Sequence, residues 1–189
     1  MAIANVKAPF GGTVTGRTKY CNCKNPEICE GSGLTHSTCV GGAAGSQIDI
    51  TPNNSDAIYL RVNYPTVRSI KTWVEIRCCD SRCSNDIRRT ITVELYALPD
   101  AGCYIGSVKY AHIANPQVSN GGIYNLTSSS KWLGTAASGF CYCSSGPHAH
   151  MERSGGSGPS ACCCTTVTTS NIIYSWTVPD PCPTAIKPA

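Results

Sequence analysis

The chain has 189 residues, of which only 14% are charged and 7% are aromatic, and it contains 18 glycines and 12 prolines. Together with its many Ser and Thr residues, this composition favours short strands and turns over helices. No segment carries a sustained helical stripe, and no apolar run approaches the roughly 20 residues that a membrane-spanning helix needs. We therefore expect no membrane span.

The net charge of +4 at pH 7 is modest, and the Lys and Arg residues are spread singly along the chain. This balance favours an anionic partner such as a cell-wall polymer. It makes no case for nucleic acid, because nucleic-acid-binding domains gather their basic residues on one face or segment.

The predicted strands follow one another from end to end, separated by turn residues. A Gly/Ser-rich loop is expected at 154–161, and an extended tail from Pro179 with Cys182 as its anchor. The chain length suits a single domain over 1–189, with a core at 8–155 and a C-terminal strand and extended tail at 156–189. The expected fold is all-β, an antiparallel sheet or sandwich. Strands are expected at 8–16, 48–50, 58–62, 69–77, 90–98, 107–113 and 165–178.

Fourteen cysteines are far more than a chain of this length normally carries. Their C-x-C and CC spacings favour disulfides over thiolate metal sites, because zinc ribbons need paired C-x2-C knuckles that are absent here. We therefore expect disulfide-stapled loops and an extracellular or cell-surface location. The first seven residues lack the basic start and apolar core of a secretory signal. Either the sequence is a mature form or the protein is exported by another route.

Two of the four histidines, His148 and His150, stand two residues apart. In an extended strand such residues project from the same face, about 7 Å apart. Gly146-Pro147 just before them is a turn signal, so we expect the pair at the start of a strand and at the edge of a cavity. One imidazole could there bind a metal while the other acts on a bound water. The alternative is a pair of exposed loop histidines.

Three segments together resemble the zinc endopeptidases of the lysostaphin or LytM type. In that family a strand bearing Asp, a Tyr-x-His strand and a Gly-Pro-His-x-His-x-Glu strand converge in a narrow groove. The resemblance spans about residues 8–155 and is closest over 107–153, and it implies a lysostaphin-like fold. The matching residues are Asp49, Tyr110-Ala111-His112, Gly121-Gly122, Trp132-Leu133-Gly134 and Gly146-Pro147-His148-Ala149-His150-Met151-Glu152.

The resemblance also implies roles for individual residues. His150 and Asp49 would be zinc ligands, and His148 and His112 would be the catalytic groups that orient the water and stabilise the oxyanion. Neutral imidazoles and a carboxylate suit Zn²⁺, and zinc lowers the pKa of its bound water. Nearby imidazoles can then move the proton.

One position departs from the family pattern. The family has its first ligand, a histidine, four residues before the aspartate, and this chain has Gly45 there. Two ligands are too few for a tight catalytic zinc site, so we expect a degenerate site and no cofactor. Zinc would bind only if the glycine-rich loop from Gly41 to Gly45 folded back and placed His36, or a cysteine such as Cys39, at the vacant ligand position.

Three functions stay open. The first is a secreted, disulfide-rich, non-catalytic peptidase-like domain with a structural, assembly or cell-wall-binding role, whose partner is peptidoglycan or further copies of the chain in a filament or surface layer. The second is an active zinc endopeptidase that hydrolyses the peptide cross-bridges of peptidoglycan. The third is a cysteine-rich binding module unrelated to peptidases, in which Asp49, His112, His148 and His150 would lie scattered.

Overall fold

The computed structural model describes the chain in several ranges, and its described part is all-β and antiparallel, as the sequence predicts. No helix occurs in these ranges. None of the described residues therefore forms a helix that could cross a membrane. The described residues are 1–10, 18–20, 47–52, 55–76, 89–139, 146–157, 166–167, 170 and 172–182.

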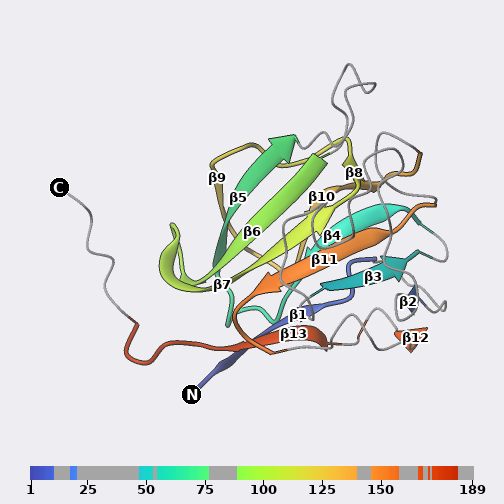
Figure 1. The fold of residues 1–189 in the computed structure, drawn as a ribbon. Coiled ribbons are helices and arrows are strands. Elements are labelled where there is room, and N and C mark those ends of the chain that lie inside the picture. The colour runs from blue at the N-terminus through green and yellow to red at the C-terminus, as the bar shows by residue number, and fades with distance from the viewer. Residues whose placement is uncertain are drawn as a thin grey trace.

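The strands assemble into three sheets (Figure 1). The largest has eight strands in the order β12-β2-β3-β11-β7-β6-β5-β9, a second has the order β4-β10-β8, and β1 pairs with β13. The strands are β1 (Ile3–Lys7), β2 (Thr18–Tyr20), β3 (Gln47–Thr51), β4 (Ala57–Arg61), β5 (Ser69–Ile76), β6 (Arg89–Leu98), β7 (Gly102–Ala111), β8 (Ile113–Ala114), β9 (Gly122–Asn125), β10 (Ser130–Ala136), β11 (Ala149–Ser154), β12 (Thr166–Val167) and β13 (Ile172–Thr177).

The alternation of side chains along β6 explains how the eight-stranded sheet obtains one apolar face. Ile91, Val93 and Leu95 are fully buried, whereas Thr92 and Glu94 between them are partly exposed. Successive strand residues point to opposite faces, so the three apolar side chains line the same side. That side forms the core of the molecule.

The two smaller sheets contribute to the same core, which makes the architecture sandwich-like. Leu60 of β4, Leu133 of β10 and Tyr174 of β13 belong to one buried cluster together with Ile91 and Val93 of the large sheet. Burial of these side chains is the main favourable contribution to folding, at about 1.5–3 kcal/mol for each large apolar side chain.

A close approach between β13 and β7 depends on Gly106. A Cβ atom added at this position would overlap the indole ring of Trp176. The indole Nε1 also donates a hydrogen bond to the carbonyl oxygen of Ser154 on β11, at 3.0 Å. Trp176 therefore fixes β13 against two neighbouring strands of the large sheet.

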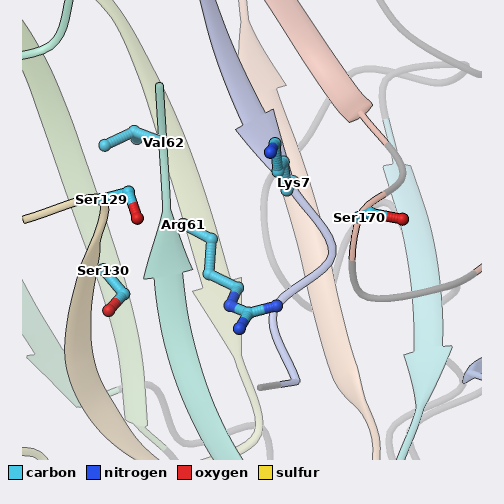
Figure 2. A pocket seen from close by; sticks show the side chains of 6 residues that line it. All are labelled: Lys7, Arg61, Val62, Ser129, Ser130 and Ser170. Atoms are coloured by element: carbon cyan, nitrogen blue, oxygen red, sulfur yellow. The ribbon is translucent and has the colours of Figure 1, made fainter. Parts of the chain in front are cut away.

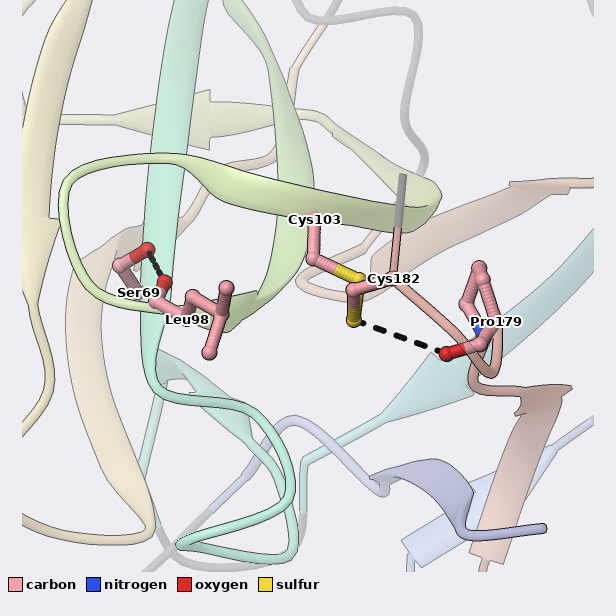
Figure 3. Close-up of a disulfide and its surroundings, with 5 residues drawn as sticks. All are labelled: Ser69, Leu98, Cys103, Pro179 and Cys182. Atoms are coloured by element: carbon pink, nitrogen blue, oxygen red, sulfur yellow. Dashed lines mark hydrogen bonds between the residues drawn. A yellow bond between two sulfur atoms is a disulfide. The ribbon is translucent and has the colours of Figure 1, made fainter. Parts of the chain in front are cut away.

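The described ends of the chain are joined to the body in two ways. β1 pairs with β13, and the backbone N–H of Val178 donates to the carbonyl oxygen of Ala2 at 2.9 Å. Beyond β13, Cys182 forms a disulfide with Cys103 of β7, 79 residues away in sequence (Figure 3). This confirms Cys182 as the anchor of the tail. The other twelve cysteines lie outside the described residues.

Three of the predicted strands differ from the observed ones, and one of them is the strand expected at 107–113, since β7 begins at Gly102 and ends at Ala111. At the start of the chain the observed strand is β1, whereas within the predicted range 8–16 only residues 8–10 are described, and Phe10 forms an isolated bridge with Ile58. The predicted closing strand is divided into β12 and β13, with a turn at Ser170 between them. β12 pairs with β2 while β13 pairs with β1, so the two halves belong to different sheets.

Candidate functional site

β11 joins two strands whose residues opposite His150, Asp49 and Ala111, are 62 positions apart in sequence. It lies between β3 and β7, and His150 is directly opposite Asp49 on one side and Ala111 on the other. For Asp49 the structure describes the backbone alone. The two residues for which the resemblance implies metal binding thus occupy neighbouring positions in one ladder.

His112 stands at the corner where the chain leaves one sheet for another. β7 ends at Ala111 in the large sheet, and β8 begins at Ile113 beside β10. His112 between them has a φ of 62°, in the left-handed region that side chains other than glycine rarely adopt. The predicted continuous strand over 107–113 is therefore wrong at this residue. Such strained positions recur at functional sites, where the surrounding structure holds them in place.

The three histidine rings that the sequence singles out are packed together. The ring centroids of His112 and His148 are 4.6 Å apart with the planes at 60°, and those of His112 and His150 are 5.9 Å apart at 72°. All three side chains are buried. They are neither scattered nor exposed in a loop, and His112 provides the contact with both members of the His-x-His pair.

The backbone around His148 fixes the tautomer of its ring. Its Nδ1 atom lies 2.9 Å from the carbonyl oxygen of Gly146, and a carbonyl can only accept a hydrogen bond. Nδ1 therefore carries the proton, and in the neutral ring the lone pair is on Nε2. β11 begins at Ala149, so of the pair expected at the start of a strand, His148 lies just before the strand and His150 lies inside it.

The ring of His150 is oriented by a buried carboxylate. Its Nε2 atom lies 3.0 Å from Oε1 of Glu152, and Oε2 of the same carboxylate lies 3.7 Å from Nζ of Lys109 on β7. A carboxylate can only accept a hydrogen bond, so Nε2 carries the proton and the lone pair of the neutral ring is on Nδ1. Metal-binding histidines usually donate their second ring N–H to a carboxylate or carbonyl in this way.

Glu152 and Lys109 have no role in the sequence-based prediction, although both lie in the matching segments. The signal was available in the period of two that places His150 and Glu152 on the same face of β11. Lys109 is directly opposite Glu152 in the ladder between β7 and β11, which brings its ammonium group close to the carboxylate.

Tyr110, the tyrosine of the Tyr-x-His segment, belongs to the core. It is fully buried opposite Met151 and Ile91, and its hydroxyl has no hydrogen-bond partner within the described ranges. Burial raises the pKa of this phenol far above its usual value, because the ionised form would lose its hydration. Tyr110 therefore stays neutral.

The described side chains do not by themselves complete a zinc site. Within the described part of the chain, no group of three His, Cys, Asp or Glu side chains is placed to hold a metal ion. His36, Cys39 and Gly45 lie outside the described residues, so the possible third ligand is not described either.

Comparison of the chain with models of protein families, with curated proteins and with solved structures finds no match. The resemblance to the lysostaphin-type enzymes therefore rests on the motif residues alone. The all-β fold and the packing of the three histidine rings are observed in the structure of this chain.

Proposed function

We propose that the protein is a secreted, disulfide-linked, non-catalytic domain of peptidase-like fold that binds the cell wall or assembles at the cell surface. The observation that carries the proposal is the ladder position of His150 opposite Asp49, combined with Gly45 at the position of the family's first ligand. In the lysostaphin-type family these positions would belong to a metal site, which here would lack its first ligand, and two donors are too few for tight zinc binding.

The covalent chemistry of the chain supports the proposed location. The Cys103–Cys182 disulfide joins a central strand to the segment after β13, and disulfides of this kind persist in oxidising compartments. The net charge of +4 supports an anionic partner, since cell-wall polymers carry carboxylate and phosphate groups.

Sedimentation with purified, insoluble peptidoglycan tests this function. The protein is expected to pellet with the peptidoglycan and to release no soluble peptide fragments, whether or not zinc is added. Light scattering over a wide range of protein concentration tests assembly in parallel. Protein that stays in the supernatant and is monomeric throughout that range contradicts the proposal.

A second candidate is an active zinc endopeptidase that hydrolyses the peptide cross-bridges of peptidoglycan. The observation that favours it is the convergence of three buried imidazoles, two of which have their tautomers set by Gly146 and Glu152. His150 and Asp49 would hold the zinc with a third donor such as His36. His112 and His148 would act on the water and the developing oxyanion.

Metal analysis separates the two functions. The active enzyme contains one zinc per chain, loses peptidoglycan hydrolysis on addition of a chelator, and loses both zinc and hydrolysis in the variant His150→Ala. The non-catalytic domain contains no zinc at neutral pH, and its sedimentation with peptidoglycan is unchanged by the chelator.

A further inference from the structure

A cationic pocket lies apart from the histidine cluster and shares no residue with it. It is a cavity of about 230 Å³. Figure 2 shows the Arg61 side chain extending from β4 toward the segment that follows β1, with two serines on the side of β10. The lining residues are Lys7, Arg61, Val62, Ser129, Ser130 and Ser170.

Segments that are far apart in sequence meet at this pocket through backbone pairing. An isolated bridge joins Val6 to Val62, which brings the end of β1 alongside the end of β4. The N–H of Val62 donates to the carbonyl oxygen of Ser129 at 2.8 Å, and Ser130 is directly opposite Arg61 between β10 and β4. Lys7 and Arg61 therefore reach one cavity from two different sheets.

The lining suits an oxyanion. It includes two cationic residues and three serines, and none of the described lining residues is acidic. One N–H of Arg61 donates to the carbonyl oxygen of Phe10 at a long 3.5 Å. A guanidinium has five N–H donors in a planar fork that matches the geometry of phosphate and carboxylate oxygens. Lys7 adds a second positive charge, and the hydroxyls add further donors.

An aromatic pair adjoins the pocket on the same outer face of the β4–β10 ladder. Trp132 is opposite Tyr59, two positions along from the Arg61–Ser130 pair, while Leu60 between these positions and Ile58 just beyond them are fully buried on the inner side. The Trp132 side chain is 44% exposed. Its Nε1 donates to the carbonyl oxygen of Gly134 at 2.9 Å, which fixes the plane of the indole.

We infer that this pocket binds a phosphate or carboxylate group carried on a sugar, with the sugar ring lying against Trp132 and Tyr59. Oxyanion binding follows from the two cations and the hydroxyls. The sugar follows from the adjoining rings, because aromatic rings offer rigid apolar surface to the C–H face of a sugar ring, while its hydroxyls stay in contact with water. The inference holds whether or not the histidine cluster is catalytic.

Calorimetric titration at constant ionic strength, with chloride as the background anion, tests the pocket. The probes are inorganic phosphate, glucose 6-phosphate, glucuronate and neutral glucose. Phosphate is expected to bind with a millimolar Kd, glucose 6-phosphate or glucuronate about threefold or more tightly, and glucose not measurably. The comparison of the two charged sugars tells whether the ligand is a sugar phosphate or a sugar acid.

Three variants assign the binding to the proposed residues. Arg61→Gln is expected to weaken the binding of every anionic probe about tenfold, since it removes charge-assisted hydrogen bonds. Lys7→Gln is expected to lower the affinity for the same probes independently. Trp132→Ala is expected to reduce the affinity for the charged sugars to that for phosphate alone. Arg68→Gln, at an exposed position outside the pocket, makes the same charge change and serves as the control.

Two outcomes overturn the inference. The first is no heat of binding from any anionic probe at about 20 mM, well above a millimolar Kd. The second is an equal loss in Arg68→Gln and Arg61→Gln, which indicates general charge attraction. Equal affinities for phosphate and both charged sugars overturn the sugar part alone.

Discussion

The Nε2 atom of His150 and the Oε1 atom of Glu152 lie 3.0 Å apart, with both side chains buried, on alternate residues of β11. The pair is an ion pair when the imidazole is protonated, and it is a hydrogen bond between a neutral ring and a carboxylate when the imidazole is neutral. It ties the orientation of the most deeply buried histidine to a carboxylate on the same strand.

Removing this carboxylate is expected to destabilise the protein. In Glu152→Ala the buried Nε2–H of His150 loses its acceptor, and an unsatisfied buried polar group costs about 1–3 kcal/mol. Urea unfolding followed by circular dichroism measures the change. Glu152→Gln is the matched control, because the amide oxygen still accepts from Nε2 while the charge is lost, and we expect it to cost less than Glu152→Ala. Equal losses in both variants would mean that charge, not the hydrogen bond, is decisive.

Tyr110 is expected to make the protein sensitive to alkali. Burial raises the pKa of its phenol in the folded state, whereas in the unfolded chain the pKa is about 10. Below pH 10 both states hold the proton, so the stabilisation is fully present. Above pH 10 the unfolded state releases the proton while the folded state keeps it, so the free energy of unfolding falls by about 1.4 kcal/mol per pH unit.

The variant Tyr110→Phe isolates this contribution. It keeps the ring in the core and removes the group that titrates, so the difference in free energy of unfolding between variant and parent is expected to grow in favour of the variant from pH 10 to about pH 11. Urea unfolding at pH 8, 10 and 11 measures the difference. A difference that stays constant over this range contradicts the assignment to Tyr110.

Gly106 is expected to tolerate no side chain. Because a Cβ would overlap the indole of Trp176, Gly106→Ala forces β13 away from β7 or moves the ring, and such overpacking costs about 1–3 kcal/mol. Gly146→Ala is the control, since nothing lies within 4 Å of an added Cβ there. Thermal unfolding of the two variants is compared with that of the parent chain. A loss in Gly146→Ala as large as that in Gly106→Ala contradicts the steric explanation.

The sequence predicts the half-buried strands well, because alternation is a local signal. The ranges expected at 48–50, 58–62, 69–77 and 90–98 agree with β3, β4, β5 and β6 to within about a residue at each end. β1 was missed because its apolar side chains include small ones, such as Ala4, and its partner β13 lies some 170 residues away.

The candidate site was predictable in its residues and less so in its geometry. His112, His148 and His150 were singled out from order and spacing, and the structure packs their rings together. The left-handed turn at His112 has no local signal, because no glycine or asparagine marks it and the change of sheet that requires it is a tertiary event. The cationic pocket was not predictable either, since Lys7, Arg61 and Ser170 come from separate parts of the chain.

The Cys103–Cys182 disulfide is expected to contribute strongly to stability. It closes a loop across 79 residues, and in the chain-entropy account a cross-link over a loop of this length destabilises the unfolded state by about 4 kcal/mol. Replacing both cysteines by Ala is expected to lower the free energy of unfolding in urea by roughly that amount under oxidising conditions. Trp176 offers a local readout, because it lies on β13, the strand just before the bridge. If the bridge holds β13 against β7, iodide should quench tryptophan fluorescence more strongly in the double variant. Unchanged stability and unchanged quenching would show that pairing with β1 and the contact with Gly106 hold β13 without the bridge.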